Sequence, residues 1–209
     1  MIIKCNNKTI AIVVPQKCGI STVTNILAYN LTGQPRSKTK CRRVLRHADC
    51  LVNPGQLEEI FFIEWCNPSP DYVFAVVRDP VERLFSAYRD RVFTKNTDKL
   101  PDTSWNYFCE TFKDLVLYNT DVGKHCRPQV HWLGLDASKY DKIFYTHEIN
   151  TRFKPIIENI IAQPIPNMLE NTSKELEIEI SDSQLAFFGK YYKQDFDFIS
   201  RAQELGKFI

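Results

Sequence analysis

Two short apolar segments, each followed at once by a helix-like pattern, most strongly constrain how this chain can fold. Residues 8–15 (KTIAIVVP) and 72–77 (YVFAVV) are rich in β-branched side chains, which is typical of buried strands. Apolar residues with helical spacing follow each segment, at 21–32 and from residue 79 to about residue 93. Strands that lead directly into helices are typical of parallel sheets, because their crossover connections are usually helical.

The rest of the chain extends this alternation. A third strand is predicted at about 142–146, and a helix follows it at 151–161. Further helices are expected at 56–63, 104–118 and, as a pair, across 181–203, with irregular segments at 34–56, 124–134 and 163–173. The predicted fold class is therefore α/β: a three-layer αβα, P-loop-like fold with a central, mainly parallel sheet, in a single domain over residues 1–209.

Charge and cysteine content narrow the class of protein. A net charge of +2 over 209 residues gives no general attraction to nucleic acid, so any anion site must be local. The seven cysteines are odd in number and form no C-x-x-C pair, which argues against a metal site and favours a reducing cytoplasm. No apolar run approaches the roughly 20 residues that span a bilayer. We expect a cytoplasmic protein without a nucleic-acid or membrane partner; the alternative is a lumenal domain separated from its membrane anchor.

The first strand-to-helix turn has the composition of an anion-binding loop. Its residues are Lys17, Cys18, Gly19, Ile20, Ser21 and Thr22. Gly19 would let the backbone approach a ligand, the amides of residues 19–22 would face an anion at the helix N-terminus, and Lys17 would add a charge. The alternative is an ordinary connection with a surface lysine. Because thiol pKa values tend to fall at helix N-termini, we also expect a lowered pKa for Cys18.

The second strand-to-helix turn combines an arginine with a hydroxyl group. Arg78 ends the strand, and Ser86 lies two turns into the next helix, on the same side as Arg83. An arginine and a hydroxyl placed in this way can together hold a phosphate. The alternative is an ordinary ion pair of Arg78 with Glu82 or Asp79.

Together, the two turns suit a ligand with an anionic group at each end, such as a nucleotide with a 5′ substituent and a 3′-phosphate. The segments VPQKCGIST and RDPVERLFSAY resemble the two signature motifs of sulfotransferases that use 3′-phosphoadenosine 5′-phosphosulfate (PAPS), P-K-x-G-x-[ST] and R-x-P-x-x-R-x-x-S-x-Y. Every fixed position of the second motif is present: Arg78, Pro80, Arg83, Ser86 and Tyr88. The first motif departs at one point, because Gln16 separates Pro15 from Lys17.

The resemblance is strongest to the carbohydrate-type branch of that family, the sulfotransferase family 2-like proteins. CRPQ at Cys126–Gln129 is similar to its H-W-x-P-Q element, and YDKIFYTHEI is similar to one of its strands. ENTSK near Asn171 and YYKQDFDFI near the end of the chain resemble its closing loop and helix. The similarity extends from about residue 10 to residue 199.

The resemblance implies an activity and a set of ligands. PAPS would be the sulfuryl donor and its bisphosphate, PAP, the product, with no metal required. Residues 17–22 would bind the 5′-phosphosulfate, and Arg78 and Ser86 the 3′-phosphate. Lys17 would be catalytic, because a cation there stabilises the charge that builds on the leaving phosphate. The acceptor would offer a hydroxyl or an amine and is expected to be a carbohydrate or glycoconjugate.

Candidates for the acceptor side lie mainly between the two motifs. His47 occupies the region where related glycan sulfotransferases often carry their general base, and Glu64 is the alternative base. His125 stands where the H-W-x-P-Q element begins. Arg43 and Arg46 belong to a basic segment that either recruits an acidic acceptor or forms a solvated surface.

Two other functions stay open at this point. A P-loop kinase of a small molecule would share the architecture, although the G-x-x-x-x-G-K-[ST] pattern is absent. A non-catalytic module could keep the fold and bind PAP or a glycan without turnover.

Overall fold

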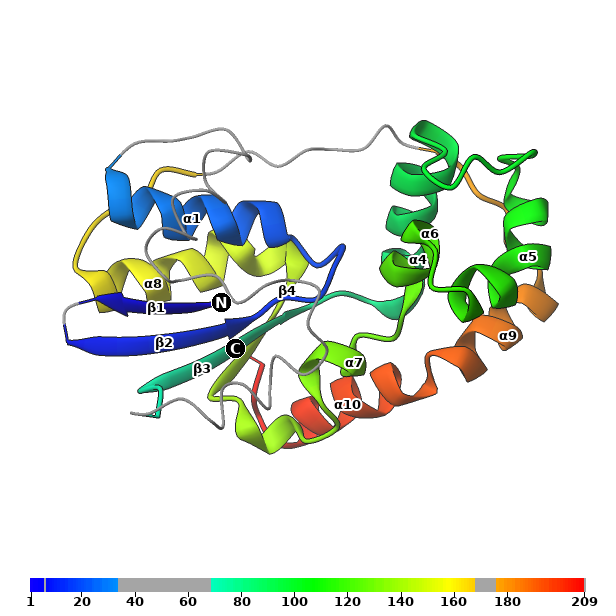
Figure 1. Ribbon diagram of the computed structural model, residues 1–209. Helices are drawn as coiled ribbons and strands as arrows, with labels where there is room; N and C mark the ends of the chain where they lie inside the picture. The colour runs from blue at the N-terminus through cyan, green and yellow to red at the C-terminus, as the bar shows by residue number, and fades with distance from the viewer. Residues whose placement is uncertain (6, 34–68, 168–175, 209) are drawn as a thin grey trace.

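A four-stranded sheet forms the centre of the protein (Figure 1). The computed structural model describes residues 1–5, 7–33, 69–167 and 176–208. The strands are β1 (Ile2–Cys5), β2 (Lys8–Val13), β3 (Tyr72–Val77) and β4 (Lys142–Tyr145), in the order β1-β2-β3-β4. β2, β3 and β4 are parallel, whereas β1 is antiparallel to β2. The predicted mainly parallel sheet is confirmed, and β1 is an addition to it.

Alternate residues of the strands face opposite sides of the sheet, and helices cover both sides. On one side, Ile12 and Phe74 pack in a buried cluster with α1 (Ile20–Thr32) and α8 (Lys154–Ile161). On the other side, the buried Val13 and Ala75 pack against two different helices. These are α7 (Val130–Leu133) and α10 (Lys193–Glu204). The three-layer αβα arrangement is thus confirmed.

A helical lobe with its own apolar core lies beyond the carboxyl ends of the parallel strands (Figure 1). Its elements are α4 (Pro80–Tyr88), the π-helix η1 (Arg89–Thr94), α5 (Trp105–Leu117), α6 (Asp121–Cys126) and α9 (Asp182–Tyr191). At its centre, Phe112 forms edge-to-face ring contacts with Phe108 and Phe188. The two parts of the molecule therefore meet at the edge of the sheet where both predicted anion sites lie.

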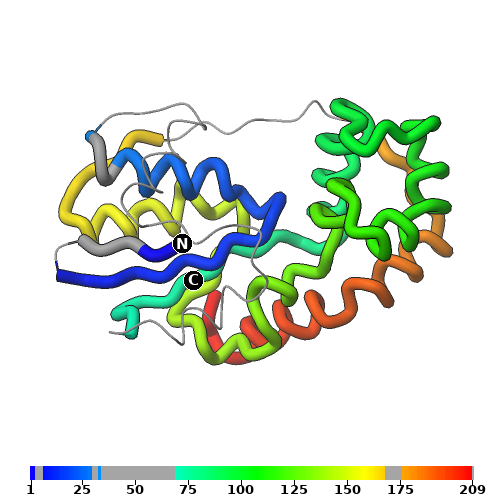
Figure 2. Tube along the Cα trace, viewed as in Figure 1, coloured from blue at the N-terminus to red at the C-terminus, as the bar shows by residue number. Residues whose placement is uncertain are grey.

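The remaining short elements connect the strands and helices of the sheet layer. They are η2 (Ala137–Lys139), η3 (Thr146–Glu148) and the π-helix η4 (Ile149–Phe153). The chain end returns to the sheet, where Ile143 pairs with Phe208 beside β4 (Figure 2). Within the described part of the chain, no helix combines the length and apolar character that crossing a bilayer requires.

Three sequence expectations differ from the structure. The segment 124–134, predicted as a loop, contains the end of α6 and all of α7. The helix predicted from residue 79 to about residue 93 changes from α to π geometry after Tyr88. The helix predicted at 151–161 likewise begins as a π-helix. The short helix expected at 56–63 lies outside the described residues.

Candidate functional site

The two strand-to-helix turns lie side by side because β2 and β3 are adjacent parallel strands. α1 begins at Ile20, directly after Gly19, whose φ of 79° is left-handed. The first turn of α1 carries no acidic residue, and no side chain caps its amides. Since the first amides of a helix lack intrahelical acceptors, the N–H groups of Ile20, Ser21 and Thr22 offer a cradle for an anion.

Gln129 connects the two turns through its buried side chain. Its Oε1 accepts hydrogen bonds from the backbone N–H of Arg78 and from the Cys18 thiol, each at 3.0 Å. Its Nε2 donates to the carbonyl of Arg78 at 2.8 Å. The side-chain amide of Gln129 therefore holds the main chain after β3 next to the loop after β2.

Asp195 of α10 supports Gln129 from behind. Its carboxylate accepts the backbone N–H groups of Gln129 at 2.8 Å and Val130 at 2.9 Å. Burial raises the pKa of this carboxyl group, while the charge of Arg83 and these hydrogen bonds act in the opposite direction. Asp195 lies in the segment YYKQDFDFI, but its contact with Gln129 spans more than sixty residues and is created only by the fold.

Arg83 is fully buried and binds main-chain carbonyl groups. Its guanidinium donates to the carbonyl of Gln16 at 3.3 Å, to that of His125 at 3.1 Å, and to that of Arg127. It also lies over the ring of Tyr192, 5.6 Å from the ring centre. Arg83 thus joins the first loop to α6, and the extra residue Gln16 supplies one of the carbonyls that it binds.

Arg78 and Ser86 occupy different environments. Arg78 has a quarter of its side chain exposed, and its Nε lies 3.5 Å from Oε2 of Glu82, which is largely exposed. Ion pairs of this kind contribute little to stability, so an incoming phosphate can replace Glu82 at low cost. The Ser86 side chain lies on α4 and is almost completely buried. The predicted pairing with Glu82 therefore exists, but it leaves the guanidinium accessible.

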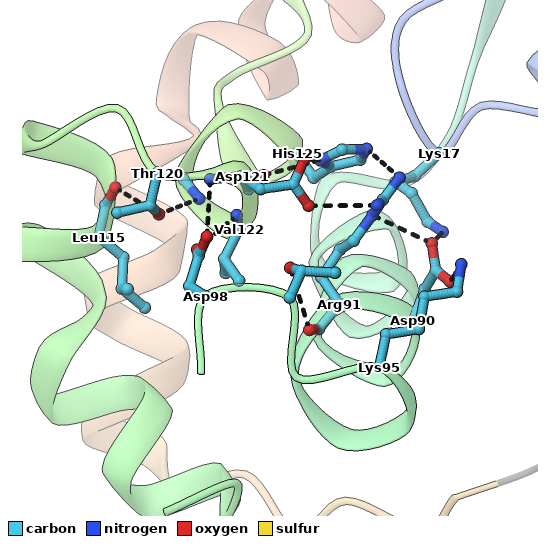
Figure 3. Close-up of polar contacts among 12 residues, drawn as sticks. Lys17, Asp90, Arg91, Lys95, Asp98, Leu115, Thr120, Asp121, Val122 and His125 are labelled. Atoms are coloured by element: carbon cyan, nitrogen blue, oxygen red, sulfur yellow. Dashed lines mark hydrogen bonds and ion pairs between the residues drawn. The ribbon is translucent and has the colours of Figure 1, made fainter. Parts of the chain in front are cut away.

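Lys17 forms an ion pair that the sequence analysis did not anticipate. Its Nζ donates to Oδ2 of Asp90, in η1, at 2.8 Å (Figure 3). Asp90 also contacts Lys95 and, at 3.3 Å, Nε of Arg91. Burial lowers the pKa of Lys17, and the hydrogen bond and charge of Asp90 counteract part of this effect. Burial also opposes ionisation of Asp90, but the hydrogen bonds from Lys17 and Lys95 outweigh it, so the pKa of Asp90 is lowered.

His125, in α6, joins this network of charged side chains through Arg91. Nη2 of Arg91 donates to its Nε2 at 2.7 Å, and Nη1 of Arg91 donates to Oδ2 of Asp121 at 3.1 Å. Because arginine can only donate, Nε2 of His125 is the acceptor and its proton is on Nδ1, which donates to the carbonyl of Asp121 at 2.8 Å. Burial and the nearby charges of Arg91 and Lys17 lower the pKa of His125, so the ring is neutral.

Comparison with known proteins adds to this geometry. A family model described as "Sulfotransferase family" matches residues 1–198. The chain belongs to the sulfotransferase family. It also resembles the crystal structure of a sulfotransferase from Alicyclobacillus acidocaldarius, with a TM-score of 0.50, 13% sequence identity and 96% of each chain covered. At this identity the likeness shows the fold alone. No curated protein matches the sequence.

The predicted lowering of the pKa of Cys18, in the first loop of this sulfotransferase, is wrong. Cys18 is fully buried in the core beneath α1, and its thiol donates to Gln129. Burial raises the pKa of this thiol to about 12, which outweighs the effect of the nearby arginines. Its backbone amide is also occupied, since it donates to the carbonyl of Pro15 at 3.1 Å. The side chain of Cys18 therefore packs beneath the loop and stays protonated.

The other sequence candidates divide into two groups. Thr22 is buried and Ser21 is half-buried at the start of α1, and His125 joins Lys17 through the Arg91–Asp90 network. Four further candidates, His47, Arg43, Arg46 and Glu64, lie outside the described residues. Asp90, Arg91 and Asp195 are additional charged residues in and beneath the site. Their place in the site follows from contacts that the folded chain creates between distant segments.

Proposed function

We propose that this sulfotransferase transfers the sulfuryl group of PAPS to a hydroxyl or amine of a carbohydrate or glycoconjugate. The observation that carries the proposal is the junction at Gln129, which holds a lysine-containing loop and an arginine-ended strand together at one edge of the sheet. This pairing suits a nucleotide with anionic groups at its 5′ and 3′ positions. The carbohydrate acceptor is supported by the sequence resemblance of the two motifs and of CRPQ to the carbohydrate-type branch.

The residues present fit such a donor. The open amides at the start of α1, without an acidic neighbour in that turn, suit the 5′ end. Arg78, with its weakly held guanidinium, and the hydroxyl of Ser86 suit the 3′-phosphate. PAPS supplies the activated sulfuryl group when bound. Charge-assisted hydrogen bonds are worth roughly 1.5–3 kcal/mol each, so contacts at both ends would add substantially to affinity.

In this mechanism, Lys17 would donate a hydrogen bond at the 5′ end of the donor and stabilise the negative charge that develops on the leaving phosphate. The amides at the N-terminus of α1 would hold the 5′-phosphate. His47 is the proposed general base that removes the acceptor proton. His125 is less suited to that task, because its Nε2 lone pair accepts a hydrogen bond from Arg91.

Two measurements test this function. Calorimetry compares PAP with magnesium-ATP, and we expect saturable binding of PAP and none of ATP. Mass spectrometry of glycan pools incubated with PAPS should then reveal products heavier by one sulfuryl group. Binding of ATP without PAP would indicate a kinase, and PAP binding without any transfer would indicate a non-catalytic module; either result would overturn the proposal.

A further inference from the structure

Lys17 is held in place from two directions. Its backbone adopts a left-handed conformation with φ of 68°, which is unfavourable for a non-glycine residue and therefore needs support from its surroundings. Its side chain is only 17% exposed and ends in the 2.8 Å contact with Asp90, whose side chain is 23% exposed. The ammonium group of Lys17 is thus held against η1 by a largely buried ion pair, three residues before α1 begins.

Asp90 is itself fixed by neighbouring cations (Figure 3). Arg91 in η1 and Lys95, directly after η1, contact it, and Arg91 is held in turn by Asp121 and His125 of α6. Asp90 lies in η1, which has π-helical geometry, and π-helical turns occur frequently at functional sites. These contacts hold the Asp90 carboxylate in place. The carboxylate can therefore fix the position of the Lys17 ammonium group.

The charges around Lys17 depend on this carboxylate. Lys17, Arg91 and Lys95 carry positive charge, Asp90 and Asp121 carry negative charge, and His125 is neutral. Without Asp90, three cations would surround one remaining carboxylate. An ammonium group has three N–H donors, so Lys17 can keep one on Asp90 and direct the others at an anion.

We propose that Asp90 is a positioning residue for sulfuryl transfer, holding the ammonium of Lys17 beside the N-terminus of α1 with two donors left for the bound phosphosulfate. This inference rests on the proposed function, because it assigns Asp90 a role in the same reaction. Asp90 acts through Lys17 and needs no contact with the donor or the acceptor.

Asp90→Asn is the direct test, measured by transfer kinetics and by calorimetry with PAP. We expect kcat to fall roughly tenfold to a hundredfold, as for misplacement of a catalytic group. PAP affinity should stay equal or increase, because a negative charge near the anion site is lost. The alkaline limb of kcat/KM should move to lower pH, since Asp90 raises the pKa of Lys17 and the transfer needs the ammonium form.

Lys95→Met should shift the alkaline limb of kcat/KM in the opposite direction. Lys95 is half exposed and lowers the pKa of Lys17, so its removal should move the alkaline limb to higher pH. This variant also keeps the inference testable if Asp90→Asn does not fold, because it changes a solvent-exposed side chain. Asp102→Asn is the matched control, since the Asp102 carboxylate accepts hydrogen bonds from Ser104, the N-cap residue of α5, and its loss should leave the pH profile unchanged. An unshifted limb in Asp90→Asn or Lys95→Met would overturn the inference.

A readout independent of activity separates this inference from the proposed function. The rate at which an amine-acylating reagent modifies Nζ of Lys17 is followed by peptide mass spectrometry. We expect faster acylation in Asp90→Asn and slower acylation in Lys95→Met than in the wild type. If the wild type neither binds PAP nor transfers sulfate, the proposed function fails. If acylation is equal in all three proteins, the positioning role fails.

Discussion

Arg78 is the residue that we propose contributes most to recognition of the 3′-phosphate. Its guanidinium is partly exposed and paired only weakly with Glu82, so its loss should cost little stability. We expect Arg78→Ala to weaken PAP binding by about 10- to 100-fold, the equivalent of one charge-assisted contact. Calorimetry measures the change, with Arg201→Ala as the control because Arg201 forms a comparable exposed pair with Glu204. Equal PAP affinity in Arg78→Ala and wild type would remove Arg78 from the site.

Gln129 illustrates a residue whose importance comes from the main-chain groups that it satisfies. Gln129→Ala leaves the N–H and carbonyl of Arg78 and the thiol of Cys18 without their partner, in a buried setting. We expect the free energy of unfolding to fall by roughly 2–4 kcal/mol. Urea denaturation measures this, and Gln203→Ala, at an exposed glutamine of α10, should change stability by less than about 0.5 kcal/mol. A similarly small effect at Gln129 would contradict its role in joining the two turns.

At the scale of helices and strands, sequence patterns predict the elements with long, regular apolar spacing. β2 and β3 stand out as β-branched runs, and α1 and α5 span thirteen residues each. α6 and α7 have only six and four residues, too few for an apolar period to appear, and tertiary contacts stabilise them. The helix start predicted at residue 79 is confirmed, since Asp79 is the N-cap of α4 and its carboxylate accepts the backbone N–H groups of Val81 and Glu82.

The same distinction applies to the candidate site. Lys17 and Arg78 could be predicted because parallel strands place their carboxyl ends at one edge, a rule that needs only the strand assignments. Asp90 follows a recognisable motif, but its contact with Lys17 spans 73 residues and joins two segments that only the fold brings together. Arg83, a fixed position of the second motif, binds carbonyl groups of distant segments, which no local pattern indicates. Long-range hydrogen bonds leave no periodic signal in the sequence.

Gly123 determines how closely α6 approaches α5. A Cβ added at this position would lie 2.0 Å from the carbonyl oxygen of Leu115, so the helices would have to separate. We expect Gly123→Ala to lower the free energy of unfolding by about 1–3 kcal/mol or more, as for overpacked cores. Gly189→Ala in α9 is the control, because no atom lies within 4 Å of its added Cβ. That variant should gain about 0.5–1 kcal/mol from helix propensity. Loss of stability at Gly189 alone would contradict this account.

At the scale of the whole molecule, the site lies where two apolar cores meet. The first loop packs on the sheet core through Cys18, whereas α4 contributes Leu84 and Tyr88 to the core of the helical lobe. Arg83 and Gln129 are the buried polar links between these regions. A ligand that contacts both turns should therefore stabilise the two regions together.

Binding of PAP offers a direct measurement of this coupling. At a PAP concentration about 100 times Kd, the folded state gains about 2.7 kcal/mol, which corresponds to roughly 5–10 °C in Tm for a chain of this size. Hydrogen exchange should slow in the loop around Lys17 and also at the start of α4, because the ligand contacts both. Adenosine 5′-monophosphate, which lacks the 3′-phosphate, should protect the first segment and leave the second unchanged. Equal protection of both segments by the two nucleotides would show that Arg78 and Ser86 do not bind the 3′-phosphate.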